Sequence, residues 1–420
     1  MSSATSQKLR GILHGDAIIW TIFFLLCAIS IIEVYSATSS LSYKDGRYWS
    51  PVMQHALFLL FGFLIVWLVH NIPCRWFKLY PLAVLPLSFA LLILVMVVGS
   101  TVNGANRGID LFGIHFQPSE LAKGGVVIAV ALILSVMQTP KGADKHAFGY
   151  ILFVTCTFCA LIAPENLSTA ALLFLVVMIM MFIGRVSLVQ ISKMLGVLGI
   201  IGAIAVAAVV VIPETAWDAM PGTHRVVTWK HRLEKFKSRT GDSEVTPKTY
   251  DITNNKQVTH ANIAIASSNI IGKMPGNSIE RDFLSQAYSD FIYAIVIEEL
   301  GLVGGAFVVI LYLVLLFRAG KIAKQCERNF PAFLVLGLSL LLVTQAMVNM
   351  CVAVGLIPVT GQPLPLISRG GTSTLINCVY IGMILSVSRF AKKREDPPSA
   401  ASHTADAPNE SEFRNAVGMA

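Results

Sequence analysis

The sequence places one acidic residue, Asp290, at the entrance to a long apolar run, in the order Ser289-Asp290-Phe291-Ile292-Tyr293. A carboxylate in such a position could act as a general base that takes the proton from an attacking hydroxyl group. An aspartate at a helix start could equally cap the first turn and interact with the helix dipole. Position alone leaves both interpretations of Asp290 open.

Two polar segments earlier in the chain could form a second cluster. They are Asn103-Gly104-Ala105-Asn106-Arg107-Gly108 and Gln117-Pro118-Ser119-Glu120-Leu121-Ala122-Lys123. Pro118 suits the first turn of a helix, on which Glu120 and Lys123 would share one face. One interpretation is an internal ion pair beside an arginine, Arg107, that reaches lipid headgroups. The other is a cationic pocket for a ligand that carries phosphate.

Two further segments have the composition of a ligand-binding surface. Residues 224–239 contain six Lys and Arg residues and one Glu, with apolar residues interleaved, which is typical of an amphipathic helix at a membrane interface. This helix could rest on anionic lipid, gather a diphosphate lipid, or do both. Residues 358–373 are rich in Pro and Gly, which stiffen a loop and let its backbone approach a ligand closely. They form either a loop and helix start or one wall of an active cleft.

Three glutamates fall inside apolar runs, where ionisable residues are costly and usually functional. Glu298 and Glu299 follow Asp290 in the same run. In a straight helix, Glu298 would lie about 12 Å deeper than Asp290, and Glu299 would point to the opposite face. We therefore assign both to internal packing or polar networks. The sequence assigns no role to the third, Glu33.

The composition indicates which elements must position these residues. Of the 420 residues, 55% are hydrophobic and only 13% are charged, and the mean hydropathy is +0.68. Soluble domains carry about 25% charged residues, so most of this chain is expected to lie in lipid. The apolar runs are continuous rather than alternating, which predicts helices and not barrel strands. The net charge of +8 reflects topology and anionic headgroups, because no basic stretch adjoins a soluble module that would bind nucleic acid.

The sequence predicts an all-α polytopic membrane protein of about ten transmembrane helices. The predicted spans are 17–38, 54–70, 77–99, 119–137, 147–163, 168–184, 189–212, 289–317, 331–357 and 368–389. Lys and Arg gather in alternate short loops, which predicts that both termini are cytoplasmic. The predicted parts of the chain are a cytoplasmic segment, 1–16, a membrane domain, 17–389, with one large extracytoplasmic loop, 213–288, and a disordered cytoplasmic tail, 390–420.

The unusual residues gather at one predicted face of the membrane. The outside face would hold the regions 100–118, 164–168, 213–288 and 358–367. A transporter with a site at the membrane midplane would instead show charges or Gly and Pro breaks in the middle of several spans. The distribution therefore predicts chemistry at the outer membrane surface.

Together these clusters resemble the SEDS family, the membrane proteins of bacterial shape, elongation, division and sporulation. The resemblance extends from the first span to Arg389. The motifs that carry it are Asn-Gly-Ala-x-Arg, Gln-Pro-Ser-Glu-Leu-Ala-Lys, Ser-Asp-Phe-Ile-Tyr-Ala with Glu-Glu-Leu-Gly, and Pro-Leu-Ile-Ser-x-Gly-Gly-Thr-Ser. There are three departures from the family pattern. The turn 164–169 is one residue longer than usual, Arg369 stands where Tyr is common, and the usual Trp after Arg107 is absent.

The resemblance implies an inverting peptidoglycan glycosyltransferase in the bacterial inner membrane, with its active site facing the periplasm. Lipid II would be both donor and acceptor. The growing glycan would pass from its undecaprenyl-diphosphate donor to the 4-hydroxyl of the GlcNAc in the acceptor lipid II. The family's essential aspartate maps onto Asp290, the expected catalytic residue. The expected substrate-binding residues are Arg107, Glu120, Lys123, Gln117, Asn103, Ser368, Gly370 and Gly371.

The resemblance also implies partners: a class B penicillin-binding protein that acts as transpeptidase, divisome proteins and membrane lipids. The sequence shows no complete metal site, although a divalent cation, Mg²⁺ or Mn²⁺, could bind at the diphosphate. The variants at 165–166 and at Arg369 favour division-type over elongation-type members of the family. Two functions of other classes stay open, a lipid II flippase and a scaffold that recruits and activates the penicillin-binding protein.

Overall fold

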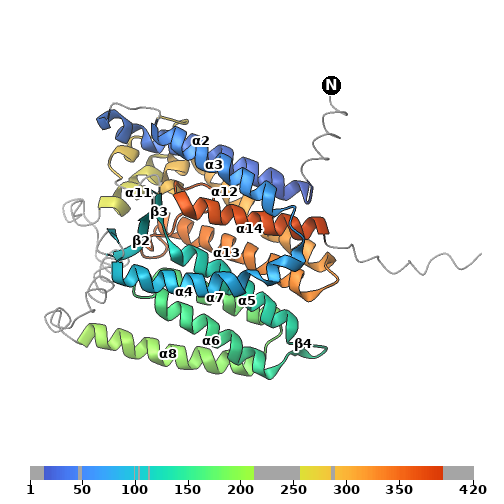
Figure 1. Cartoon of the computed structure of the whole chain (residues 1–420). Coiled ribbons are helices and arrows are strands. Elements are labelled where there is room, and N and C mark those ends of the chain that lie inside the picture. Colours follow the sequence, from blue (N-terminus) through green and yellow to red (C-terminus); the bar gives the residue numbers. More distant parts are fainter. Residues whose placement is uncertain are drawn as a thin grey trace, which may run out of the picture.

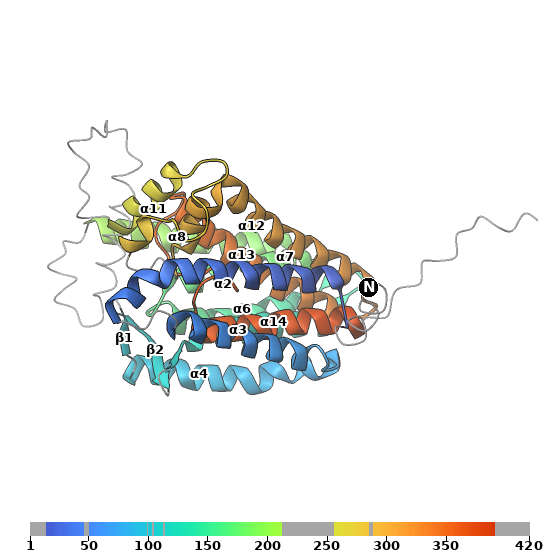
Figure 2. The ribbon, with the colours of Figure 1, turned by 90° about the horizontal axis from the view of Figure 1, so that it is seen from above.

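The computed structural model describes residues 14–45, 50–98, 100–102, 105–111, 114–211, 256–284 and 289–390 of the chain. Most of them form long helices that run side by side (Figures 1 and 2). The helices are α2 (Ala17–Asp45), α3 (Ser50–Val69), η1 (Cys74–Lys78), α4 (Tyr80–Val98), α5 (Pro118–Val136), α6 (Lys145–Ile162), α7 (Leu167–Ile183), α8 (Leu188–Val211), α11 (Lys256–Ser267), η2 (Glu280–Asp282), α12 (Ile292–Gln325), α13 (Asn329–Ala353) and α14 (Gly371–Phe390).

The prediction of a helical, multi-span membrane protein is confirmed. Within the described ranges, eight helices are long and apolar enough to cross a membrane, and two shorter apolar runs, Leu167–Ile183 and Leu188–Ile204, accompany them. Each of the ten predicted spans overlaps one α-helix, because a continuous apolar run of this length can satisfy its backbone in lipid only as a helix.

The first and last spans meet at one end of the bundle. The backbone N–H of Asp16 donates to Ser388 Oγ (2.9 Å), and Arg318 Nε lies 2.6 Å from Asp16 Oδ2. The start of α2 and the end of α14 therefore lie together, on the right in Figure 1, as an even number of crossings requires. Residues 1–13 and 391–420, which include most of the predicted N-terminal segment and tail, lie outside the described residues.

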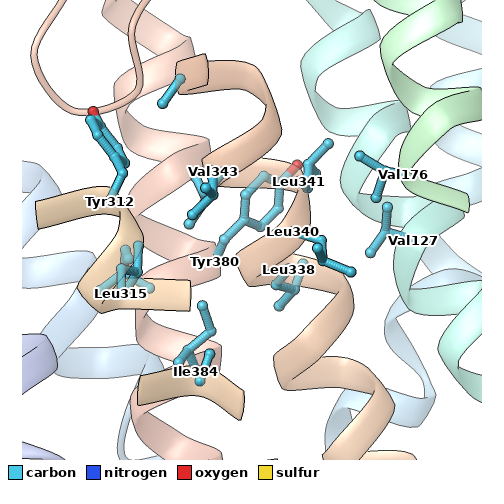
Figure 3. Packing of buried hydrophobic residues seen from close by; sticks show 14 of the residues in the cluster. Val127, Val176, Tyr312, Leu315, Leu338, Leu340, Leu341, Val343, Tyr380 and Ile384 are labelled. Carbon is cyan, nitrogen blue, oxygen red and sulfur yellow. The ribbon is translucent and has the colours of Figure 1, made fainter. Parts of the chain in front are cut away.

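The interior of the bundle is formed mainly by α5, α13 and α14. In α5 and α14, 72% of the span is buried, against 22% in α3 and α4, which present most of their length to lipid. Figure 3 shows the ring of Tyr380 in α14 packed among Leu340 and Leu341 of α13. Gly124 of α5 makes room for this ring, because a Cβ there would lie 2.1 Å from the Tyr380 hydroxyl oxygen. Small residues at such contacts let membrane helices approach closely.

A small antiparallel sheet, which was not predicted, lies at the other end of the bundle (Figure 1, left). Its strands are β1 (Ser100–Val102), β2 (Ala105–Leu111) and β3 (Ile114–Phe116), in that order across the sheet. Val102 pairs with Ala105, and Leu111 pairs with Ile114. Between β1 and β2 the sequence reads Asn-Gly, the dipeptide that tight hairpins favour. A second, two-stranded pair follows α5 and consists of β4 (Gln138–Thr139) and β5 (Gly142–Ala143).

Helix α12 is broken near its start. Gly301 has φ 73° and ψ −176°, a conformation that is essentially restricted to glycine and does not occur in a helix. Residues 292–300, which we call the α12 arm, fold back on the part that follows, so that the Tyr293 hydroxyl donates to the Gly305 carbonyl (3.1 Å). In a straight helix these residues would lie about 18 Å apart along the axis. The α12 arm therefore does not continue in the direction of the rest of α12, but the break follows Glu298 and does not alter the spacing between Asp290 and Glu298.

Candidate active site

The Pro-rich loop, residues 358–370, is held inside the protein by side chains from three helices. Its carbonyl groups accept hydrogen bonds from Asn349 Nδ2 (Gln362 O, 2.7 Å), Gln345 Nε2 (Pro363 O, 3.1 Å), the Tyr312 hydroxyl (Pro365 O) and Ser30 Oγ (Ile367 O, 2.7 Å). Figure 3 shows the Tyr312 hydroxyl directed at a loop segment. Because buried carbonyl groups need partners, these four side chains fix the path of a loop that forms no regular structure.

Asp290 lies against the Pro-rich loop. Asn349 Nδ2 also donates to the Asp290 carbonyl (3.0 Å), and Ser368 Oγ donates to the Ser289 carbonyl (2.6 Å). The Asp290 side chain is half-buried, and its Oδ1 accepts a hydrogen bond from Ser289 Oγ (3.0 Å). The N-cap of α12 is Phe291, without a side-chain cap. Asp290 therefore lies directly before this N-cap, with its backbone fixed.

Glu120 and Lys123 on α5 form the ion pair that their spacing predicts. Lys123 Nζ lies 2.8 Å from Glu120 Oε1 and also donates to Gln345 Oε1 (2.8 Å). Ser373 Oγ donates to the other oxygen of the Glu120 carboxylate (3.4 Å). Both side chains are 1% exposed. A pair buried this deeply is stable only when further hydrogen bonds complete it, which is the role of Gln345 and Ser373.

The two clusters belong to one network. Gln345 contacts Lys123 through its amide oxygen and the Pro-rich loop through its amide nitrogen, while Asn349 contacts the same loop and Asp290. The contact between Ser373 and Glu120 places the first turns of α14 and α5 side by side. Helix N-termini carry partial positive charge, so this end of the bundle suits a negatively charged ligand.

The predicted substrate-binding residues differ in exposure. The half-buried ones are Gln117, Gly370 and Gly371, and the buried ones are Glu120, Lys123 and Ser368. The half-buried residues could face a ligand directly. The buried residues instead hold the surrounding backbone and charges in place, and the ammonium group of Lys123 is enclosed by Glu120 and Gln345.

Three of the expected features lie wholly or partly outside the described residues. Asn103 and the basic segment 224–239 lie outside them, and Arg107 is described only as backbone in β2. Strand β2 contacts α4 and pairs with β3, which contacts α14. The backbone of Arg107 therefore lies at the end of the bundle that carries the start of α14.

Gln345 and Asn349 were not among the predicted site residues. The sequence marks them as two polar residues four apart in an apolar run, a spacing that puts both on one face of α13. Polar residues within a span usually have partners, but these partners are distant in sequence and cannot be identified from it. Arg369, next to Gly370, is a half-buried cation of the same loop and donates to Gln54 Oε1 (3.0 Å).

Comparison with known proteins gives the family. The FtsW/RodA/SpoVE family, described as "Cell cycle protein", matches residues 16–393. The probable peptidoglycan glycosyltransferase FtsW of Halomonas elongata is 30% identical over 392 residues, which cover 91% of this chain and 92% of that protein. The protein of the same name from Haemophilus influenzae is 29% identical over 387 residues, covering 90% and 91%.

Solved structures share the fold. A chain from "Structural coordination of polymerization and crosslinking by a peptidoglycan synthase complex" aligns with a TM-score of 0.66 and 23% identity, over 89% of this chain and 98% of that one. The rod shape determining protein RodA of Thermus thermophilus aligns with a TM-score of 0.57 and 22% identity, over 90% and 98%. The likeness in fold and the family match over most of the chain agree with the motifs, and the chain belongs to the FtsW/RodA/SpoVE family, the SEDS proteins.

Proposed function

We propose that this protein is a peptidoglycan glycosyltransferase that polymerises glycan strands from lipid II in cell division. The names of its relatives support the reaction class and the division type. The observation that carries the proposal is the placement of Asp290, whose backbone is held by Asn349 while its side chain stays half-buried. A general base positioned in this way contributes about 10²–10⁴-fold to a rate.

Asp290 takes the proton from the 4-hydroxyl of the acceptor GlcNAc while that hydroxyl oxygen attacks the anomeric carbon of the donor. A β-1,4 bond forms with inversion, the bond from the anomeric carbon to the diphosphate oxygen breaks, and undecaprenyl diphosphate leaves with the electron pair. The half-buried position of Asp290 then lets its proton pass to solvent. Ser289 Oγ, which donates to Oδ1, orients the carboxylate for this step.

The departing diphosphate requires positive charge, which stabilises it best when it is fixed in advance. The adjacent first turns of α5 and α14 supply partial charges, and Arg107 is the full charge that we assign to the diphosphate. Lys123 acts indirectly, because its buried ammonium group is bonded to Glu120 and Gln345. Lys123 fixes the start of α5, and this in turn fixes the position of Gln117, the half-buried residue directly before the helix.

A divalent cation at the diphosphate, Mg²⁺ or Mn²⁺, would need carboxylate ligands from the protein. Within the ranges that the structure describes, no group of three or more His, Cys, Asp or Glu side chains could hold a metal ion. Glu120, the carboxylate of the α5 cluster, is already engaged by Lys123 and Ser373. A cation at the diphosphate would therefore be held largely by the phosphates themselves, and no step above depends on one.

The site faces the periplasm at the outer surface of the bacterial inner membrane. The support is the distribution of basic residues, since Arg318 lies beside the start of α2 at the end of the bundle opposite the site. A class B penicillin-binding protein is the proposed transpeptidase partner, because a structural relative is a complex that combines polymerization with crosslinking. Divisome proteins are the further partners expected for a division-type enzyme.

The test is polymer synthesis from lipid II by the purified protein, in detergent and together with its penicillin-binding protein. The wild type should make glycan polymer, whereas Asp290→Asn and Asp290→Ala should still bind lipid II and make at least about 100-fold less. Asp282→Asn is the matched control, because Asp282 is 53% exposed in a segment near the site and should retain activity. Near-normal polymer from either Asp290 variant would overturn the assignment.

The same assay distinguishes the enzyme from the other two functions, a lipid II flippase and a scaffold. Detergent contains no two compartments, so a protein that only flips lipid II would yield no polymer. A protein that only recruits its partner would also yield no polymer, because a transpeptidase crosslinks peptides and does not join sugars. The result expected of the enzyme is therefore polymer from the wild type and from Asp282→Asn, and almost none from the Asp290 variants.

A further inference from the structure

Two adjacent glutamates of the α12 arm, neither used in the reaction above, bind a segment that precedes Asp290 in the chain. Glu298 accepts hydrogen bonds from Lys273 Nζ (2.7 Å), Ser278 Oγ (2.5 Å) and the Ile279 amide (3.2 Å). Glu299 accepts them from the Gly276 amide (3.1 Å), the Ser278 amide (3.2 Å) and the Ser36 hydroxyl. Both glutamates are fully buried. We call these six contacts the glutamate clamp.

Backbone contacts continue the clamp around the break at Gly301. The amides of Lys273 and Met274 donate to the carbonyls of Glu298 and Glu299 (2.9 and 2.8 Å). Beyond the break, the Leu302 amide donates to the Asn269 carbonyl (3.4 Å). The segment 269–279 therefore supplies the partners that the carbonyls and amides at a broken helix lack.

The two backbones approach so closely that both contact positions must be glycine. Gly272 has φ 83°, and a Cβ there would lie 2.3 Å from the Glu299 carbonyl oxygen. A Cβ on Gly301 would lie 2.2 Å from the Ile270 carbonyl oxygen. The segment and the α12 arm thus fit together in one way, and the side chains that close this contact are the two glutamates.

The clamp is also attached to the first span. Arg281 Nη1 donates to Ser36 Oγ of α2 (2.9 Å) and to the Gly276 carbonyl (2.8 Å), and Ser36 in turn contacts Glu299. The α12 arm is therefore fixed between α2 and the segment 269–279 at one end. At its other end the chain continues directly into Asp290 through Phe291.

We propose that Glu298 and Glu299 are positioning residues, which set the place of Asp290 by fixing the α12 arm to the segment 269–279. The inference rests on the proposed function of Asp290. Six donors converge on two carboxylates, and a carboxylate accepts hydrogen bonds without donating any. A glutamine would direct an NH₂ group at these donors, so even this conservative change breaks part of the clamp.

Glu298→Gln and Glu299→Gln, singly and together, test the inference in the full-length protein with its penicillin-binding protein. The matched control is Glu280→Gln, because Glu280 is a largely buried acid close to the clamp whose described partner, His260 (2.6 Å), lies on α11 and not on α12. Each variant is first required to match the wild type in yield and apparent melting temperature, which separates positioning from a general loss of folding.

Hydrogen exchange reports on the clamp without any activity. We expect the amides of 273–279 and those of the α12 arm to exchange faster in the Glu298 and Glu299 variants, and to keep wild-type rates in Glu280→Gln. Faster exchange confined to 273–279, with an unchanged α12 arm, would show that the glutamates order only their own segment and would overturn the inference.

Kinetics report on the consequence for Asp290. A displacement of about 1 Å of a reacting group can lower a rate by about 100-fold, so kcat for polymerisation should fall by this order while KM for lipid II stays within about threefold. A wild-type kcat in the double variant would overturn the inference. If the wild-type complex itself makes no polymer, the proposed function fails, and the exchange data still decide whether the clamp orders the arm next to Asp290.

Discussion

Two lysine–glutamate pairs lie in the part of the protein that contains the proposed site, and they differ in construction. Glu120 and Lys123 sit three residues apart on one helix, and both are 1% exposed. Lys273 and Glu298 lie 25 residues apart in different segments, and only the glutamate is fully buried, since the lysine is 25% exposed. The first pair is local and enclosed, whereas the second joins two segments near the surface.

The difference shows how each carboxylate is stabilised. Glu120 depends on Lys123 for its only described cationic partner, with one hydroxyl, that of Ser373, at its second oxygen. Glu298 has Lys273 as well, but it also accepts from a hydroxyl and from a backbone amide. Loss of the lysine should therefore be severe in the first pair and mild in the second.

Lys123→Met should have the largest effect. The substitution leaves the Glu120 carboxylate buried without a cation, which costs about 3–5 kcal/mol in comparable pairs. We expect a large drop in the apparent melting temperature of the purified protein and loss of polymer synthesis with it.

The double variant Glu120→Gln with Lys123→Met separates charge from structure. Replacing both members of a buried pair by neutral residues of similar size is often close to neutral for stability. The double variant should therefore recover most of the melting temperature. Recovery of stability without activity would show that the reaction needs this charge pair, and failure to recover stability would contradict the view that the pair is unstable only when broken.

The pair of Glu120 and Lys123 was predictable from the sequence, whereas the pair of Lys273 and Glu298 was not. Residues three apart on a helix face each other wherever the helix lies, so the contact of Glu120 with Lys123 follows from spacing. The contact of Glu298 with the segment 269–279 depends on the break at Gly301, which nothing in a continuous apolar run reveals.

The fold and the site also differ in how far the sequence alone could predict them. The spans were predictable because lipid imposes a length and a composition on each helix separately. The network that fixes Asp290 was not, because Asn349, Ser368 and the Pro-rich loop meet only in the folded bundle. The position of Asp290 at the start of a span was readable, but its support by these residues required the structure.

Glu33 is another buried acid, and no lysine of the described residues forms an ion pair with it. It lies in α2, is fully buried, and neither carboxylate oxygen has a hydrogen-bond partner among the described residues. A buried polar group left without partners costs about 1–3 kcal/mol, so Glu33→Met should raise stability by this order. The measurement is the apparent melting temperature together with polymer yield. A fall in melting temperature, or a tenfold loss of activity, would show that Glu33 has a partner during function and is not simply tolerated.

Lys273→Met should have the smallest effect and sharpens the comparison most directly. Its ammonium group is partly exposed, so water can take its place at the Glu298 carboxylate more easily than at the enclosed Glu120. Glu298 keeps the Ser278 hydroxyl and the Ile279 amide, and the backbone contact of residue 273 with Glu298 does not involve the side chain. We expect a melting temperature within a few degrees of the wild type and polymer synthesis within about threefold. A loss as large as that of Lys123→Met would mean that the lysine, rather than the backbone amides and hydroxyl, holds Glu298, and that both pairs depend on a cation in the same way.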